Sequence, residues 1–443
     1  MKINAQLDMD VVALEAEGTV TCLLTLEAPL LASTAGRPPE ALIVVLDRSG
    51  SMAGSKLDAA NASLHALVDA LLPQDSFGLV TFDSQARIAI PTRAMSDHHR
   101  PTLHELIDQI EPGNTTDLSA GYLLGLREAR WHRTNTGASV MVLSDGYANQ
   151  GTTDEATLAQ LATGARDSNI TTVTIGLGEG YDDSLLEAMA AAGSGSHRFA
   201  STPDDATAIV AQEAGDLLTK AVINTFVRIR PVEPLGVDGI GTLHNVPRWI
   251  DKDDTGAPTV VIPLGDIYSG EQRELLIQFT VPSLAHLGSY ELAELTVDFV
   301  ALPNLEAGEV HWPVTVGVVT QHEADRQVPE PTVRVAALLA EVVATKGKAM
   351  DALQREDAKE AERQLRQGAK KLEHQASGMT NVPEPIRQRL REEETQLRAL
   401  QVRAREQGLE YSRRRLREDV SLNSRGRSDD VRRTRSRHRE MGE

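Results

Sequence analysis

The sequence has few cysteines, few aromatic residues and no long apolar run. Its one cysteine, Cys22, cannot form a disulfide bond within the chain, whereas a secreted adhesion protein of 443 residues would usually carry disulfides. The N-terminal stretch MKINAQLDMD has no apolar region of the kind that signal peptides contain. No run approaches the roughly 20 apolar residues that a membrane-spanning helix needs. We therefore expect a cytoplasmic protein that does not enter a membrane.

Aromatic residues make up 3% of the chain and hydrophobic residues 41%, so the cores must consist mainly of Val, Leu, Ile and Ala. The charge is divided unevenly. Residues 1–345 contain 20 Lys and Arg against 46 Asp and Glu, whereas residues 346–443 contain 25 against 18. The acidic body argues against a general nucleic-acid-binding protein. The Arg-rich end, residues 419–443, lacks interleaved aromatic residues, so we expect a disordered and solvated tail.

Residues 41–219 alternate apolar strands with helical patterns. The strand-like runs are rich in β-branched residues and unbroken, as in strands that are buried on both faces. They read ALIVVLD, FGLVTF, SVMVLSD and ITTVTIG. The helical stretches are 56–72, 99–109, 118–133, 154–167, 183–192 and 203–219. This alternation predicts an α/β domain with a doubly wound, mostly parallel sheet.

Strands without intervening helices occupy both sides of that domain. Residues 2–28 contain two alternating apolar and polar runs, and residues 220–320 contain five strand-like runs between Gly- and Pro-containing turns. We expect residues 220–320 to form an antiparallel β-sandwich. Two strands alone are marginally stable, so we place residues 1–30 in the same sandwich. The α/β domain is then an insertion within it, reached through the linker at 29–40.

Residues 331–418 have a helical pattern with two apolar stripes. One consists of Leu365, Ala369, Leu372 and Ala376, and the other of Ile386, Leu390, Leu397 and Leu400. The segment MTNVPEP separates them. The pattern predicts an antiparallel helical hairpin, which would offer a second interaction surface.

The segment VVLDRSGSM, at the end of the first predicted parallel strand, contains the first candidate functional residues. Ligands bind at the carboxyl ends of strands in such sheets. Asp47, Ser49 and Ser51 occupy alternate positions there and can face one point, because Gly50 allows a tight turn. One carboxylate and two hydroxyls are hard oxygen ligands that suit Mg²⁺ or Mn²⁺ rather than zinc.

Three oxygens do not complete an octahedron, so neighbouring strand ends should add ligands. The strand in VMVLSDGYANQG ends in Asp145 and Gly146. The loop in EPGNTTDLSAGYLLGL presents Thr115 and Thr116 before a helix. The sequence therefore predicts a metal site formed by three separate segments.

These three segments resemble the metal-ion-dependent adhesion site of von Willebrand factor type A domains. The resemblance covers about residues 41–219. It places five residues on the metal-site positions: Asp47, Ser49, Ser51, Thr116 and Asp145. Where the family usually has Gly-Gly-Thr-Asn/Asp-Leu, this chain reads NTTDL. The sandwich that includes the N-terminus also resembles bacterial members and the inter-alpha-trypsin-inhibitor heavy chains.

The resemblance implies how the site works. The serines and the threonine would bind Mg²⁺, or Mn²⁺ or Ca²⁺, directly, and the aspartates would act largely through water. An Asp or Glu of a partner protein would fill the remaining coordination position. The domain would bind a partner rather than catalyse a reaction.

Other interpretations of the same residues stay open. Asp47 to Ser51 resembles an ordinary strand-to-helix cap. An aspartyl nucleophile would need a second Asp two positions on, where the chain has Ser49. A metal-dependent phosphohydrolase would need a general base, and none stands out. A scaffold with a purely structural metal would bind its partner equally well in EDTA. His98, His99 and His104 lack the spacing of a zinc site and fit a solvated helix start.

Overall fold

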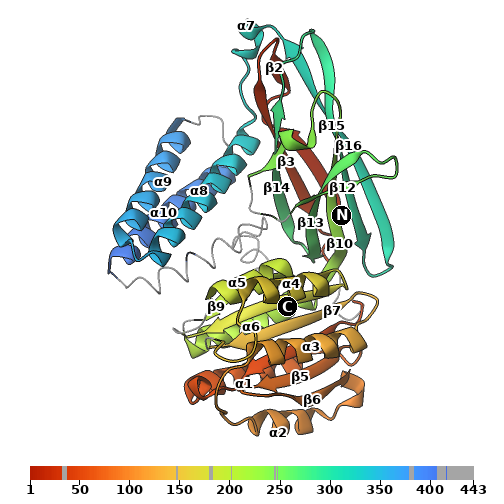
Figure 1. Cartoon of the computed structure of the whole chain (residues 1–443), viewed down its shortest axis with the longest axis vertical. Coiled ribbons are helices and arrows are strands. Elements are labelled where there is room, and N and C mark those ends of the chain that lie inside the picture. The colour runs from red at the N-terminus through yellow and green to blue at the C-terminus, as the bar shows by residue number, and fades with distance from the viewer. Residues whose placement is uncertain are drawn as a thin grey trace. The chain divides into compact units, whose positions relative to one another are not determined.

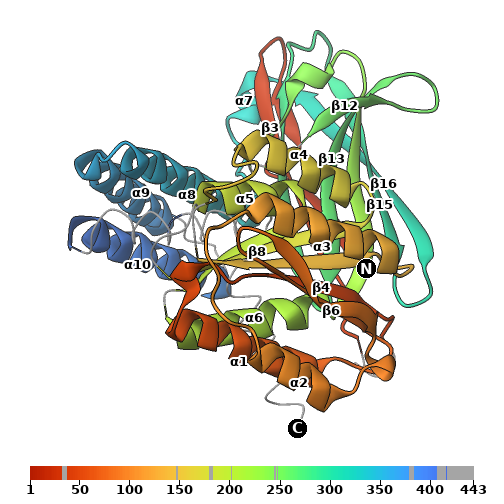
Figure 2. The same ribbon diagram turned by 60° about the horizontal axis from the view of Figure 1, so that its bottom comes forward.

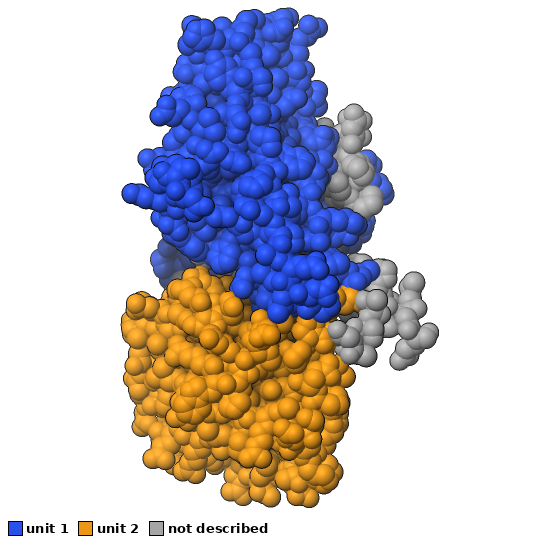
Figure 3. All heavy atoms as spheres, turned by 90° about the vertical axis from the view of Figure 1, so that its right-hand side faces the viewer, with its two compact units in different colours: residues 1–30, 221–443 blue, residues 31–220 orange. Residues whose placement is uncertain are grey.

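The computed structural model describes residues 1–31, 37–145, 148–178, 183–200, 202–243, 246, 248–378, 384–406 and 416. The predicted tail at 419–443 and Gly146 lie outside these residues. The chain divides into two compact units, residues 1–30 with 221–443 (unit 1) and residues 31–220 (unit 2) (Figure 3).

Unit 2 contains a six-stranded sheet with the order β6-β5-β4-β7-β8-β9. The parallel strands are β4 (Ala41–Asp47), β5 (Ser76–Phe82), β7 (Ala138–Ser144), β8 (Ile170–Leu177) and β9 (Ser194–Ala200). The edge strand β6 (Ala86–Ala94) is antiparallel to β5. Every residue of β4, β7 and β8 is buried, because helices cover both faces of the sheet. The predicted doubly wound, mostly parallel sheet is confirmed.

Among the described residues of unit 2, six α-helices form the outer layers. On one face lie α1 (Ser55–Ala70), α2 (Arg100–Asp108) and α6 (Pro203–Leu217) (Figure 2). On the other lie α3 (Leu118–His132), α4 (Glu155–Arg166) and α5 (Asp183–Ala192). The predicted helices agree with these bounds to within a few residues. The two strands that the sequence analysis did not predict, β6 and β9, lie at the two edges of the sheet.

A buried ion pair joins the two ends of unit 2. Lys220 Nζ lies 2.8 Å from Glu40 Oε1, and both side chains are almost fully buried. Ser139 Oγ donates a hydrogen bond of 2.8 Å to the same carboxylate oxygen. The chain thus enters and leaves unit 2 at adjacent points, which an insertion into another domain requires.

Unit 1 contains two further sheets (Figure 1). In the four-stranded sheet the order is β1 (Lys2–Leu7), β3 (Gly18–Glu27), β14 (Gln272–Val281) and β11 (Ile240–Thr242). The six-stranded sheet has the order β12 (Trp249–Lys252), β13 (Pro258–Tyr268), β10 (Lys220–Pro231), β15 (Gly288–Ala301), β16 (Glu306–Val319) and β2 (Val11–Ala13). Antiparallel pairing dominates, and β2 alone among the described pairs of these sheets is parallel to its neighbour.

The N-terminal strands belong to these sheets. β3 pairs with β14 over ten residues, from Gly18 opposite Val281 to Glu27 opposite Gln272. β3 therefore occupies an interior position of its sheet, between β1 and β14. Its Cys22 and Leu24 are fully buried. The packing of the two sheets into a sandwich stays a prediction.

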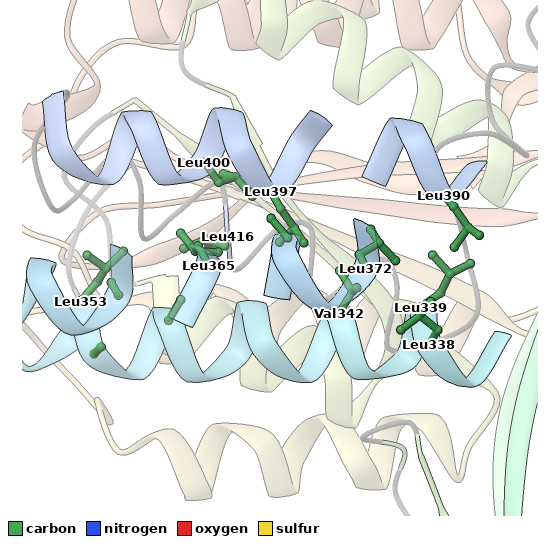
Figure 4. Close-up of a cluster of buried hydrophobic side chains, with 14 of the residues drawn as sticks. Leu338, Leu339, Val342, Leu353, Leu365, Leu372, Leu390, Leu397, Leu400 and Leu416 are labelled. Atoms are coloured by element: carbon green, nitrogen blue, oxygen red, sulfur yellow. The ribbon is translucent and has the colours of Figure 1, made fainter. Parts of the chain in front are cut away.

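Three helices end the described chain, where the sequence analysis predicted a hairpin of two. They are α8 (Pro331–Gln354), α9 (Ala358–Gly378) and α10 (Glu384–Glu406). Figure 4 shows their leucines pointing toward one another in a shared core. The predicted stripe residues Leu365, Ala369, Leu372, Leu390, Leu397 and Leu400 all belong to this core. The other two predicted positions, Ala376 and Ile386, lie outside the described side chains.

The additional helix α8 is apolar on two sides. Leu338, Leu339 and Val342 face α9 and α10, whereas Val333, Ala336 and Ala340 pack with Leu23 and Leu276 of the four-stranded sheet. A helix that is buried on two sides shows no single apolar stripe. The pattern of period 3.6 that marked α9 and α10 was therefore weaker in α8. The remaining short helices are α7 (Gln321–Ala324), η2 (Gly50–Met52), η3 (Met95–Asp97) and η4 (Val237–Gly239).

Within the described ranges, we find no helix with the length and apolar content that a membrane crossing requires.

Candidate metal centre

Two buried aspartates lie at the carboxyl edge of the parallel sheet in unit 2. β4 ends at Asp47, and Asp145 directly follows the neighbouring parallel strand β7. Asp47 is 0% and Asp145 1% exposed. Strand ends of this kind form the ligand-binding edge of doubly wound sheets. The fold therefore brings together the two carboxylates that the sequence analysis predicted at this edge.

Hydrogen bonds orient both oxygens of the Asp47 carboxylate. The backbone N–H of Ser49 donates to Oδ1 over 2.8 Å, and Ser144 Oγ donates to Oδ2 over 2.7 Å. The chain then turns through η2, the short helix that contains Gly50 and Ser51. This turn places the two serine side chains on the same side of the loop, as their alternate spacing predicted.

A continuous row of oxygens runs from this loop to β7. Ser49 Oγ and Ser51 Oγ are 3.1 Å apart, and Ser51 Oγ donates to Asp145 Oδ1 over 2.8 Å. The structure thus joins four of the five predicted residues, Asp47, Ser49, Ser51 and Asp145, in one cluster.

The loop that contains Thr116 is tied to this cluster through the backbone. Gly50 N–H donates to the carbonyl oxygen of Asn114 over 2.8 Å. Asn149 binds the backbone of Thr116 on both sides, accepting from its N–H over 3.0 Å and donating to its carbonyl over 3.1 Å. Thr116 is 3% exposed, whereas Thr115 is exposed to solvent. Thr116 is therefore the threonine that faces the interior.

The electrostatics of the cluster favour a bound cation. Burial raises the pKa of the Asp47 carboxyl, and the negative charge of Asp145 raises it further. The hydrogen bonds from Ser144 and Ser49 oppose this rise in pKa. A carboxylate pair that is desolvated in this way gains most from a positive charge placed beside it.

One positive charge at the cluster, that of Lys56, was not predicted from the sequence. Lys56, the second residue of α1, forms an ion pair with Oδ2 of Asp145, and its Nζ lies 3.4 Å from the carbonyl oxygen of Ser51. Its side chain is 34% exposed. The only signal in the sequence was a lysine nine positions after Asp47, at the start of the helix that follows the loop.

Arg48 was also missed. Its guanidinium bridges Asp83, at 2.6 Å, and the carbonyl oxygen of Glu111, at 3.1 Å. These contacts hold the 47–51 loop against the end of β5 and against the segment that leads to Thr116. Arg48 and Ser144 thus support the loop, while the predicted side chains line it.

The residues present fit a hard divalent cation. The side chains of the cluster offer carboxylate and hydroxyl oxygens, which Mg²⁺, Mn²⁺ and Ca²⁺ prefer over nitrogen or sulfur. Across the described part of the chain, no group of three or more His, Cys, Asp and Glu side chains is placed to hold a metal ion. The cluster contains two carboxylates, and its other donors are hydroxyls. The cluster thus offers carboxylate and hydroxyl oxygens to a divalent cation.

Unit 2 thus has a doubly wound α/β architecture with its polar cluster at the carboxyl edge of the sheet. Residues 41–213 match the family model of the von Willebrand factor type A domain. Residues 41–213 are therefore similar to von Willebrand factor type A domains, which are mostly modules for protein interaction.

Two solved structures share the fold over nearly the whole chain. One is the von Willebrand factor type A protein from Catenulispora acidiphila, with a TM-score of 0.73, 18% identity, and coverage of 96% of this chain and 97% of that one. The other is the ArnB paralog VWA2 from Sulfolobus acidocaldarius, with a TM-score of 0.62, 15% identity and the same coverage. The additional sheets and helices thus recur together with the α/β domain.

Two bacterial proteins and one plant protein are similar in sequence. The uncharacterized protein sll0103 of Synechocystis sp. is 25% identical over 68% of this chain and 72% of its own length. The uncharacterized protein YfbK of Escherichia coli is 27% identical over 55% of this chain, which spans 42% of that protein. The E3 ubiquitin-protein ligase WAV3 of Arabidopsis thaliana is 27% identical over 56% of this chain and 32% of its own length.

Proposed function

We propose that this chain is a cytoplasmic, metal-dependent protein-binding protein whose von Willebrand factor type A domain recognises an acidic residue of its partner through a divalent cation. The observation that carries the proposal is the row of oxygens from Asp47 through Ser49 and Ser51 to Asp145. Buried carboxylates are rare unless they are paired or bind a metal.

Five residues would hold the cation. Ser49, Ser51 and Thr116 supply neutral hydroxyl oxygens, while Asp47 and Asp145 supply the negative charge. Mg²⁺ is the cation we favour, with Mn²⁺ and Ca²⁺ as alternatives, because all three prefer oxygen ligands. When bound, the cation supplies a coordination position for an oxygen of the partner. Ser144 and Arg48 keep the loop in place.

The charge of the chain supports a role for the metal in attracting an acidic group. Residues 1–345 contain 46 Asp and Glu against 20 Lys and Arg, so the body of the protein repels acidic partners at long range. An Asp or Glu side chain would approach this edge of the sheet only when a cation offers it a favourable contact. The partner is therefore expected to bind weakly or not at all after the metal is removed.

Two other functions are less well supported. A phosphohydrolase with an Asp47 nucleophile would need an accessible carboxylate, but Asp47 is fully buried and both its oxygens accept hydrogen bonds. Ligase activity does not follow from the relative WAV3, because this chain spans 32% of that protein. A scaffold with a purely structural metal stays the alternative, and it would bind its partner equally well in EDTA.

The test compares partner capture from native lysate by the wild type, Thr116→Ala and Asp58→Ala, each with Mg²⁺ and with EDTA. Thr116→Ala removes a ligand without burying a charge, so we expect weaker capture by a folded protein. Asp58, an exposed carboxylate on α1, is the matched control and should have no effect. Each exposed carboxylate of the captured partner is then changed to its amide. Binding that survives EDTA undiminished would show that the partner uses another surface, of which α8 to α10 is the first to test.

A further inference from the structure

We propose that the ammonium group of Lys56 is a built-in positive charge of the metal site. In the metal-free protein it compensates the charge of Asp145 and so lowers the affinity for metal. In the metal-bound protein it leaves the site with a positive charge that strengthens binding of a carboxylate. This inference rests on the proposed function, and it adds a residue that sets the affinity and selectivity of the site.

The geometry gives Lys56 a direct place at the site. Asp145 uses Oδ1 to accept the hydrogen bond from Ser51 Oγ, and Oδ2 to accept the one from the Lys56 ammonium. Both oxygens of this carboxylate are thus engaged, one by a predicted metal ligand and one by a cation. The Lys56 side chain is 34% exposed, so it lies within reach of a group that approaches from solvent.

The position of Lys56 in α1 argues that the ion pair serves the site rather than the helix. A cation in the first turn of a helix is unfavourable because the N-terminus carries a partial positive charge. The same turn also contains Asp58, which does satisfy the helix dipole. Lys56 therefore reduces the stability of the helix at this position and gains its stabilisation from Asp145.

The stem of Lys56 is also confined. It runs beside Gly178, which directly follows β8 and has a φ of +76°. A Cβ atom at Gly178 would lie only 2.9 Å from Lys56 Cε, so the glycine leaves room for the stem. Because packing already restricts the stem, formation of the ion pair costs the lysine little further rotamer entropy. The ammonium is thus held at the cluster by packing as well as by charge.

Counting charges shows what Lys56 changes. Asp47 and Asp145 together carry two negative charges, so a divalent cation alone would leave the site neutral. With Lys56, the site carries one negative charge before the metal binds and one positive charge afterwards. The metal affinity is therefore lower than it would be at two carboxylates with no lysine beside them. Once the metal is bound, the site binds an anionic oxygen more tightly than it would without Lys56.

The first experiment measures metal affinity by calorimetry with Mn²⁺ and Mg²⁺ for the wild type, Lys56→Met, Lys56→Gln and Lys56→Arg. We expect Lys56→Met and Lys56→Gln to bind metal about tenfold more tightly, because removal of a neighbouring like charge has effects of this size. Lys56→Arg keeps the charge and should resemble the wild type. Equal metal affinity in all four proteins would overturn the inference and leave the proposed function intact. A wild type that binds no metal would instead overturn the proposed function.

Thermal unfolding separates this role from a purely structural ion pair. In EDTA, Lys56→Met should melt at a lower temperature than the wild type, because two buried carboxylates face each other without a cation. Saturating Mg²⁺ should remove most of this difference in melting temperature, since the metal supplies a positive charge in place of the lysine. An equal difference in melting temperature with and without Mg²⁺ would mean that Lys56 has only a structural role.

The second experiment tests the charge of the loaded site with acetate as the carboxylate probe. Acetate is titrated into Mn²⁺-saturated protein while the relaxation of water protons by Mn²⁺ is followed. Acetate should displace bound water at a concentration several-fold lower in the wild type and Lys56→Arg than in Lys56→Met. If these three proteins bind acetate equally, Lys56 does not strengthen anion binding and this part of the inference is wrong.

Discussion

At the scale of single residues, Asp47 gives the most direct test of metal binding. It is fully buried, and its carboxyl has a raised pKa because of burial and the neighbouring Asp145. A ligand that binds only the folded state raises the melting temperature by mass action. We therefore expect millimolar Mg²⁺ to raise the melting temperature of the wild type and of Asp58→Ala, but not that of Asp47→Ala. Differential scanning fluorimetry with and without EDTA measures this.

Asp47→Ala on its own should not unfold the protein. The change removes a desolvated carboxylate together with its repulsion from Asp145, and it also removes the hydrogen bonds that Asp47 accepts from Ser144 Oγ and the Ser49 backbone N–H. Because these effects oppose each other, we expect a change in stability of about 1–2 kcal/mol in EDTA. A wild-type melting curve that neither Mg²⁺ nor Mn²⁺ moves would contradict the metal centre itself.

The candidate site shows which residues a sequence can reveal. Asp47, Ser49 and Ser51 lie within one loop, so their spacing alone places them together. Asp145 follows a strand of the same sheet, and the rule that ligands gather at carboxyl edges locates it. Lys56 and Ser144 could not be found in this way. Their contacts depend on the direction in which α1 leaves the loop and on the register of β7 beside β4.

At the scale of secondary structure, β3 explains why residues 1–30 matter for folding. It lies between β1 and β14, and its Cys22 is 0% exposed. Burial and the nearby charge of Asp8 raise the pKa of the Cys22 thiol to about 12. Since only the thiolate reacts readily, this cysteine should be inert in the folded protein at pH 8.

Labelling with Ellman's reagent at pH 8 should therefore detect no fast-reacting thiol in the native protein and one thiol after denaturation. A chain that lacks residues 1–17 loses β1 and β2 but keeps Cys22. It should react much faster, because β3 then becomes an edge strand. Fast labelling of the intact protein would show that β3 is not held in the sheet as described.

The elements that were predicted well are those with one clear pattern. β4, β7 and β8 are unbroken runs rich in β-branched and other apolar residues because they are buried on both faces, and α9 and α10 have a single stripe. β6 and β9 were missed because edge strands such as ARIAIPTRA and SGSHRFA mix charged and small residues with apolar ones. The sequence pattern predicted two helices rather than three, because α8 is apolar on two sides and has no single apolar stripe.

At the scale of the whole molecule, the boundary of unit 2 predicts that the metal site can be separated from the rest of the chain. The strands, helices and site loops of residues 31–220 form one compact unit, and the pair between Glu40 and Lys220 closes its two ends. All five predicted site residues lie inside it, as does Lys56. We expect residues 31–220, expressed alone, to unfold cooperatively and to show the same rise in melting temperature with Mg²⁺ as the full chain.

The Glu40 and Lys220 pair provides the control for this experiment. Removal of one member of a buried ion pair leaves the other charge uncompensated, which typically costs about 3–5 kcal/mol. Lys220→Met should therefore strongly destabilise residues 31–220 while leaving their affinity for Mn²⁺ unchanged, because the pair lies at the amino end of β4 and the metal site lies at its carboxyl end. Calorimetry with Mn²⁺ at a temperature well below melting separates the two effects. If residues 31–220 fold but bind no metal, while the full chain does bind it, the site requires a contribution from unit 1 and the description of the metal centre as a property of unit 2 is wrong.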